Sequence, residues 1–305
     1  LLHNKTINNL KSTNVFKSVK TEIIDGSAKG LKIIDISVEE KPTGEISAGA
    51  GYGSSGSTIA IGIKENNFKG DGVKLDANLK LRQDSIQGRV SYTHPNFAYS
   101  DRALTTSIES SSLDKEKEYG YKSSLNEITL GASFEQYENI FFAPRISISN
   151  ETLKTTSTAS ANYKKQEGSY FDTLLSYSLT YNTLNSSFKP TDGYVTSFFQ
   201  TLPLIQDSSS ILNSFSSAIY NEFSEDVIGS LKFNVKAIHG IDDDVRLTNR
   251  LFASSKGLRG FVSGKVGPKD GVDWVGGNYL TTFTAEAQLP NLLPESYKTD
   301  FNLFL

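Results

Sequence analysis

The chain has 305 residues, of which 37% are hydrophobic, and a formal net charge of −3. No stretch reaches the roughly 18 consecutive apolar residues that a membrane-spanning helix needs, so a helical membrane protein is excluded. The slightly negative charge argues against a general nucleic-acid binder, which usually carries a clustered basic surface. The absence of cysteine excludes disulfide frameworks, thiolate metal sites and cysteine nucleophiles.

The segment of residues 1–43 has a pattern of its own. Ile7 and Leu10, with Leu2 or His3 one turn earlier, fall at helical spacing and predict a short amphipathic helix. Two strand-like segments and a connecting turn follow, at Phe16–Ile24, Leu31–Glu39 and Asp25–Gly30. A helix and a hairpin make part of a small α+β domain, which we expect to end where Pro42-Thr43-Gly44 interrupts the chain.

From Gly44 onward, apolar and polar residues alternate with a period of two. In Val73–Arg82 every odd position is Val, Leu or Ala, and every even position is Lys, Asp, Asn or Arg. Such alternation places one face of the strand in an apolar environment and the other against water or polar groups. Comparable runs cover Ile59–Lys64, Leu175–Tyr181 and Leu231–Ala237. About thirteen such runs occur, each close to the ~9–11 residues that cross a bilayer as a tilted strand.

Soluble β-sandwiches also alternate, but three features favour a membrane barrel. The polar face carries full charges, which a wet lumen tolerates and a sandwich core does not. The long connections fall at one end of the expected strands, as in outer-membrane barrels, at Ser112–Ser124, Asn150–Ser169 and Gly240–Gly277. Aromatic residues near strand ends would form an interfacial girdle: Phe68, Tyr92, Phe97, Tyr99, Phe188 and Tyr194. The predicted fold is therefore mainly β, a transmembrane antiparallel β-barrel.

Both ends of the chain are expected to be incomplete. The chain does not begin with Met, and Leu1-Leu2-His3 is not the start of a signal peptide. Phe301–Leu305 resembles the middle of a strand. A membrane barrel cannot leave an edge open, and bacterial barrels normally have an even strand number. We therefore expect closing strands beyond Leu305, and we expect that this piece alone does not form a closed barrel.

Motifs in a fixed order along the chain resemble one family of barrel proteins. Gly44–Gly53 looks like the first barrel strand of the BamA family, and Val38–Thr43 resembles the last strand of that family's final POTRA domain. The turns Asn67–Gly72, Pro95–Phe97 and Lys189–Gly193 are similar to turns of the same family. The most specific resemblance is to the family's longest extracellular loop with its RGF tip, in Gly257–Phe261, Val266–Asp270 and Gly276–Asn278.

The resemblance covers essentially the whole chain and implies its domain organisation. Residues 1–43 would be the C-terminal part of the last POTRA domain. Residues 44–305 would be a truncated transmembrane barrel with about 13 of an expected 16 strands present. Residues 240–277 would form the long extracellular loop.

The resemblance also implies an anchor for this loop, which in the family folds back into the barrel. The anchor motif is Leu258, Arg259, Gly260 and Phe261. Its expected partner in the lumen is Glu286, which shares a face with Thr282 and Thr284 on a predicted strand. A second partner, an aspartate, would directly follow Leu305. A buried arginine without a carboxylate would be costly. As an alternative, Arg259 staples the loop and takes no part in the mechanism.

A lateral gate at the first barrel strand is the second site that the resemblance implies. Glycine weakens a strand interior, which suits a barrel that opens there. An incoming strand would pair with the exposed edge by β-augmentation. The gate strand comprises Glu45, Ile46, Ser47, Ala48, Gly49, Ala50, Gly51, Tyr52 and Gly53.

The implied function is that of a non-enzymatic assembly factor that folds and inserts nascent β-barrel proteins into the outer membrane. Its expected partners are unfolded outer-membrane β-barrel clients, accessory assembly lipoproteins and outer-membrane lipid, without nucleic acid. The expected location is the outer membrane of a Gram-negative bacterium, with the POTRA part in the periplasm. No cofactor or metal is expected, and the sequence shows no P-loop and no catalytic triad pattern.

Other functions remain as alternatives. A POTRA-barrel secretion pore shares the RGF loop, and a translocation-assembly relative is a closer competitor. An outer-membrane phospholipase needs a nucleophile beside a histidine, and the three histidines are scattered over separate elements. Gly51–Gly56 fits G-x-G-x-x-G, but that motif requires a helix after it, and Thr58–Ile63 alternates as a strand. Asp242–Asp244 lacks the remainder of a calcium loop and is expected to be solvated.

Overall fold

The computed structural model describes residues 6–7, 10–11, 15–28, 30–53, 56–116, 120–207, 209–224, 227–255, 257–289 and 301–305. They belong to two compact units, Leu1–Gln83 with Gln87–Ser107 and Asp84–Ile86 with Ile108–Leu305. The helix expected near Leu2, Ile7 and Leu10 lies largely outside the described residues, although residues 6, 7, 10 and 11 are helical. No helix in these ranges is long and apolar enough to cross a membrane.

Strands β1 (Phe16–Asp25) and β2 (Lys32–Glu40) form a separate two-stranded antiparallel sheet. Their bounds agree with the two predicted segments to within one residue. Ile24 and Ile33 pair across the strands and are 44% and 50% exposed. An isolated hairpin is at best marginally stable in water, so this one needs packing against further structure.

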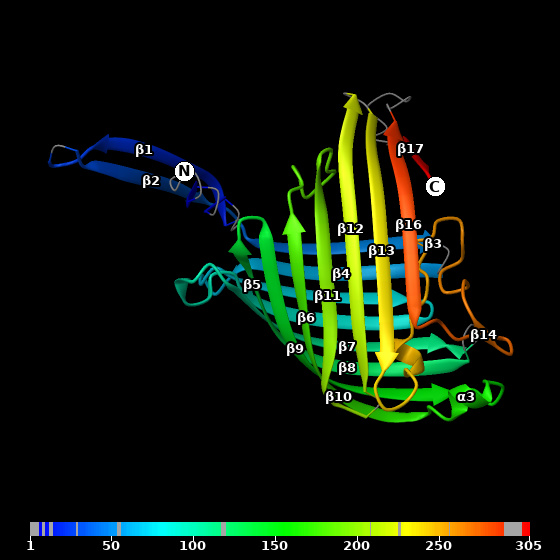
Figure 1. Ribbon diagram of the computed structural model, residues 1–305. Coiled ribbons are helices and arrows are strands. Elements are labelled where there is room, and N and C mark those ends of the chain that lie inside the picture. Colours follow the sequence, from blue (N-terminus) through cyan, green and yellow to red (C-terminus); the bar gives the residue numbers. More distant parts are fainter. Residues whose placement is uncertain are drawn as a thin grey trace. The chain divides into compact units, whose positions relative to one another are not determined.

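A 13-stranded sheet contains most of the remaining strands, and in it the strands are paired in chain order (Figure 1). From one edge to the other they are β3 (Gly44–Gly53), β4 (Gly56–Phe68), β5 (Val73–Arg82), β6 (Ser85–His94), β7 (Ala103–Lys115), β8 (Tyr121–Tyr137), β9 (Ile140–Thr155), β10 (Gly168–Asn182), β11 (Gly193–Gln206), β12 (Ser210–Ser224), β13 (Val227–Gly240), β16 (Tyr279–Leu289) and β17 (Phe301–Phe304). The predicted up-and-down antiparallel sheet is confirmed, and β3 and β17 are its edges.

In a soluble protein, apolar side chains are mostly buried and polar ones exposed. The two faces of this sheet show the reverse. On β8 and β9, Ile128 pairs with Ile148 and Leu130 with Ile146, and all four side chains are 45–55% exposed. Polar side chains on the other face are buried instead, among them Thr129, Ser147, Ser149, Glu151, Asp172 and Ser176. Exposed apolar residues on one face and enclosed polar residues on the other are the arrangement of a membrane barrel.

Two predicted loops are shorter than expected. Within the predicted loop Ser112–Ser124, β7 continues to Lys115 and β8 begins at Tyr121. Within the predicted loop Asn150–Ser169, β9 continues to Thr155 and β10 begins at Gly168. Serine, threonine, asparagine and charged residues occupy both faces here and obscure the two-residue period, while the backbone ladder continues through Tyr121↔Thr155 and Gly168↔Leu153. Hence β8 and β9 have 17 and 16 residues.

Candidate functional site

The long connection between β13 and β16 is an ordered loop over much of its length. It contains a 3-10 turn (Leu247–Asn249) and the short pair β14 (Lys269–Asp270) and β15 (Asp273–Trp274). Its two arms meet where Leu251 and Gly277 exchange backbone hydrogen bonds of 2.8 and 2.9 Å. The neighbouring Gly276 has a φ of 64°, and a Cβ there would lie 2.9 Å from the Phe252 ring. Only glycine fits this position without rearrangement.

The predicted partners Arg259 and Glu286 lie together in the structure. Arg259 Nη1 and Nη2 donate to Glu286 Oε1 and Oε2 at 3.2 and 3.4 Å. The guanidinium also lies 4.8 Å from the centre of the Phe304 ring. The Arg259 side chain is 38% exposed and that of Glu286 is 13% exposed. The ion pair therefore joins a partly solvent-exposed loop tip to an enclosed position on the polar face of β16.

The other anchor residues surround this ion pair. Leu258 is half-buried, and its N–H donates to the Ser254 carbonyl at 2.9 Å. Gly260 has a φ of 84°, a left-handed conformation that favours glycine at the tip. Phe261 is 57% exposed. The tip thus inserts a leucine and an arginine and leaves the phenylalanine outside the packed part.

Lys232 shares the same carboxylate, which the sequence did not indicate. Its Nζ lies 3.0 Å from Glu286 Oε2. Lys232 is directly opposite Thr284 on the neighbouring strand, one step diagonally from Glu286, so both side chains emerge on the same face. Glu286 therefore has two cationic neighbours, one on a fixed strand and one on the loop.

A second arginine of the loop, Arg246, is far more buried than Arg259. Its side chain is 1% exposed, donates to Asp172 on β10, and lies 3.7 Å from Glu151 on β9. Its guanidinium is 4.3 Å from the centre of the Tyr170 ring. Both carboxylates lie on the polar face, four residues from the strand ends Thr155 and Gly168. Arg246 therefore fixes the base of the loop to β9 and β10.

The loop also binds the connection between β9 and β10, which carries the short helix α3 (Ala161–Lys164). Asp273 accepts a hydrogen bond of 3.1 Å from the Ser160 N–H, just before the helix. Asn162 donates to Asp270 at 3.0 Å, and the Tyr163 hydroxyl donates to the Trp274 carbonyl at 2.5 Å. Burial raises the pKa of Tyr163 above its ordinary range, so the hydroxyl stays a donor.

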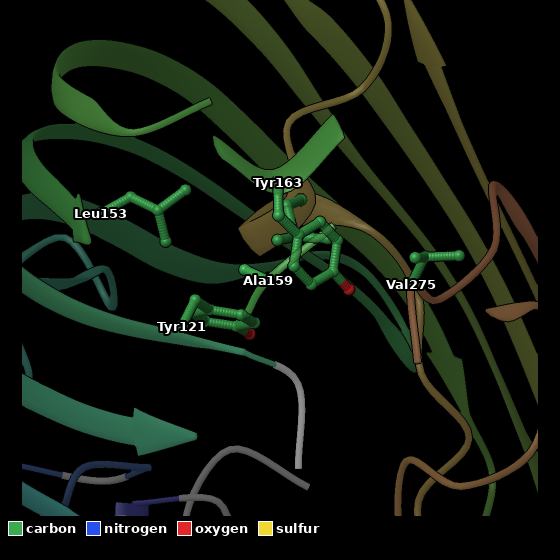
Figure 2. Close-up of a cluster of buried hydrophobic side chains, with 6 residues drawn as sticks. Tyr121, Leu153, Ala159, Tyr163 and Val275 are labelled. Atoms are coloured by element: carbon green, nitrogen blue, oxygen red, sulfur yellow. The ribbon is translucent and has the colours of Figure 1, made fainter. Parts of the chain in front are cut away.

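The main hydrophobic cluster of the described residues lies at this junction. Figure 2 shows the ring of Tyr163 close to Ala159, with Tyr121 below it and Val275, from the long loop, to one side. The rings of Tyr121 and Tyr163 meet edge to face at 6.1 Å. The buried members are Tyr121, Leu153, Ala159, Tyr163, Leu247 and Val275. Packing of the long loop against the β9–β10 connection and the adjoining ends of β8 and β9 therefore helps to hold the loop in place.

The predicted gate strand is β3, which belongs to the other compact unit. It pairs with β4 from Gly44↔Glu65 to Gly53↔Gly56. Among the described residues it has no partner on its second side, because it ends the sheet order. A Cβ on Gly49 or Gly51 would meet no atom within 4 Å. Residues Glu45–Gly53 thus form an edge of the sheet. At Gly49 and Gly51 no side chain covers the backbone of this strand.

The structure also shows the surroundings of two further motifs, Gly51–Gly56 and Asp242–Asp244. The glycine motif Gly51–Gly56 leads into strand β4, and not into the helix that phosphate binding requires. Asp244 forms an ion pair with Arg250, and in the described ranges no group of three or more His, Asp or Glu is arranged to hold a metal ion.

Comparisons with known proteins agree with the fold. Residues 67–305 match the Omp85 superfamily domain. The chain is 27% identical over 271 residues to the outer membrane protein assembly factor BamA of Neorickettsia risticii, covering 86% of this chain and 36% of the relative. It is 25% identical over 307 residues to a SAM50-like protein of Schizosaccharomyces pombe, covering 94% of this chain and 63% of the relative. It therefore spans about one third to two thirds of these relatives' lengths.

Solved structures share the same architecture. BamA from Haemophilus ducreyi lacking POTRA domains 1–3 matches with a TM-score of 0.83 and 21% identity, over 99% of this chain and 64% of that one. CdiB from Acinetobacter baumannii matches with a TM-score of 0.58 and 14% identity, over 97% of this chain and 55% of that one. The domain match covers most of the residues and nearly all strands of the sheet, so the chain belongs to the Omp85 superfamily.

Proposed function

We propose that this chain provides the barrel of an outer-membrane protein assembly factor, which inserts β-barrel proteins into the membrane without enzymatic chemistry. The observation that carries the proposal is the similarity of both sequence and fold to proteins named BamA. The chain is 27% identical to an outer membrane protein assembly factor BamA, and 99% of it matches the fold of another BamA with a TM-score of 0.83. Unfolded β-barrel clients, outer-membrane lipid and accessory lipoproteins are the proposed partners.

The gate of this assembly factor is proposed to lie at β3. An edge strand presents unpaired N–H and C=O groups to which another strand can add. The outward side chains of β3 include Ile46 and Tyr52, which are 79% and 89% exposed. A client strand that pairs here would cover both its own backbone and that of β3. Formation of the client's hydrogen bonds and its burial in lipid would supply the free energy.

The same proposal assigns parts of the chain to the periplasm, the membrane and the cell exterior. Residues 1–43, with the β1–β2 hairpin, are the C-terminal part of a POTRA domain in the periplasm. The loop 240–277 is extracellular, and its tip reaches the polar face of the barrel wall through Arg259 and Glu286. Exposed isoleucines and leucines on the opposite face contact lipid, and the location is the outer membrane of a Gram-negative bacterium.

Reconstitution of the full-length protein tests the proposed function. Liposomes that contain it are expected to convert an unfolded β-barrel client into its folded, protease-resistant form faster than empty liposomes. A matched sample with a heat-denatured preparation controls for the lipid surface alone. A secretion pore would instead give ionic conductance and no acceleration of client folding, and that combination would exclude the assembly function.

A further inference from the structure

The tip of the long loop shares its carboxylate with a strand residue. Glu286 Oε2 lies 3.0 Å from Lys232 Nζ and 3.4 Å from Arg259 Nη2, while Oε1 lies 3.2 Å from Arg259 Nη1. Among the described residues these are the two cations at Glu286. The carboxylate is enclosed, at 13% exposure, whereas the lysine and arginine are 34% and 38% exposed.

The two cations differ in what holds them. Lys232 stands on β13, which is paired along its length with β12 and β16, and its Nζ lies 5.8 Å from the centre of the Tyr220 ring. Arg259 stands on a loop tip that adjoins the exposed Phe261. If the tip moved away, Arg259 would leave and Lys232 would stay.

A carboxylate that loses its only cation in an enclosed position is strongly disfavoured. With Lys232 in place, Glu286 keeps an ion pair after Arg259 departs. We propose that Lys232 is a positioning residue that makes the RGF tip releasable, because it neutralises Glu286 in the state in which the tip is lifted. Its relevance to client insertion rests on the proposed function, but the release itself is a property of this chain alone.

Thr282 provides a reporter for release of the tip. It lies two residues before Thr284 on the polar face of β16, and its Cγ2 is 3.8 Å from the place of a Cβ on Gly257. The tip therefore covers a strand position that does not move with the loop. Because the chain has no cysteine, Thr282→Cys introduces a single thiol into these 305 residues. The rate of its modification by a bulky maleimide in the full-length protein, reconstituted in liposomes, measures tip release.

Lys232→Met in the Thr282→Cys background is expected to slow modification severalfold, because Arg259 becomes the only cation at Glu286. Lys232→Arg keeps a cation and is expected to retain the original rate. Glu286→Gln is expected to speed modification, and Lys232→Met added to Glu286→Gln is expected to change nothing further. Lys236→Met is the matched control, since Lys236 lies on the same strand and face and makes no salt bridge with Glu286.

Other results of the maleimide assay would contradict the proposed role of Lys232. Unchanged or faster modification in Lys232→Met, or the same slowing in Lys236→Met, would overturn the proposal. Folding of each variant is checked by its gel mobility before and after heating. No client is present in the maleimide assay. A result that overturns tip release would therefore not argue against the assembly function. In the same way, a failure to accelerate client folding would not argue against tip release.

Discussion

Replacing Arg246 with methionine is expected to lower the free energy of unfolding by about 3–5 kcal/mol. The substitution keeps the length of the side chain but removes the charge that neutralises Asp172 and Glu151. Both carboxylates are buried, at 8% and 11% side-chain exposure, so they would be left without a cation. Urea-induced unfolding of the full-length protein in detergent micelles measures the change.

Arg250→Met is the matched control for this prediction. Arg250 lies four residues further along the same loop and pairs with Asp244, whose side chain is 66% exposed. The Arg250 side chain is 19% exposed and its Nε donates to the Val245 carbonyl at 3.2 Å, but its carboxylate partner is hydrated, so this variant should lose less stability than Arg246→Met. Glu151→Gln and Asp172→Asn, added to Arg246→Met, should recover part of the loss. Equal stabilities of the Arg246 and Arg250 variants would show that Arg246 does not fix the loop.

Tyr163→Ala is expected to cost about 3–5 kcal/mol and to free the long loop from α3. The side chain is 2% exposed, packs against Tyr121, and binds the Trp274 carbonyl. Its removal leaves a cavity at the centre of the hydrophobic cluster and an unpaired carbonyl on the loop. Limited proteolysis within residues 241–278 is the measurement, and cleavage should become much faster than in the parent protein.

Tyr163→Phe separates the two contributions. It keeps the ring and removes only the hydroxyl donor, so a smaller cost of about 1 kcal/mol is expected. Tyr137→Ala is the control, because Tyr137 is 68% exposed, and a surface substitution of this kind changes stability by about 0.5 kcal/mol or less. If cleavage of the loop in Tyr163→Ala matched that in Tyr137→Ala, the cluster would not be what holds the loop.

The sheet could be predicted from the sequence because its signal is local. Alternation such as that of Val73–Arg82 depends only on neighbouring residues and on the two sides of a pleated strand. The signal fades where both sides are polar, which is why the ends of β7 to β10 were predicted as loops. There the backbone ladder continues while the side chains no longer distinguish the faces.

The site could be predicted only in part. The pairing of Arg259 with Glu286 came from the resemblance to a loop motif, and the structure places the two in contact. Arg246 was missed because Asp172 lies 74 residues away along the chain and because Asp242–Asp244 made its segment look solvated. One signal was present: Glu151 and Asp172 are carboxylates among Ser and Thr on a polar face, which indicates that a cation must meet them.

The POTRA assignment of residues 1–43 and the aspartate expected after Leu305 stay predictions. The hairpin β1–β2 has the expected strands, but its exposed isoleucines have no covering layer among the described residues. The second carboxylate partner predicted for Arg259 would lie outside these 305 residues. Its presence would add a further ion pair to the tip and would strengthen the hold on Arg259.

Disulfide trapping of a client on β3 tests the central proposal most directly. Ile46→Cys in β3 and Ile128→Cys in β8 place single thiols on exposed apolar positions, at 79% and 55% exposure. Of these two strands, β3 is an edge of the sheet, whereas β8 is paired on both sides. With a cysteine in the last strand of a client, a client disulfide is expected at position 46 and none at position 128 during insertion. Insertion that proceeds without a disulfide at position 46, or with equal trapping at both positions, would contradict it.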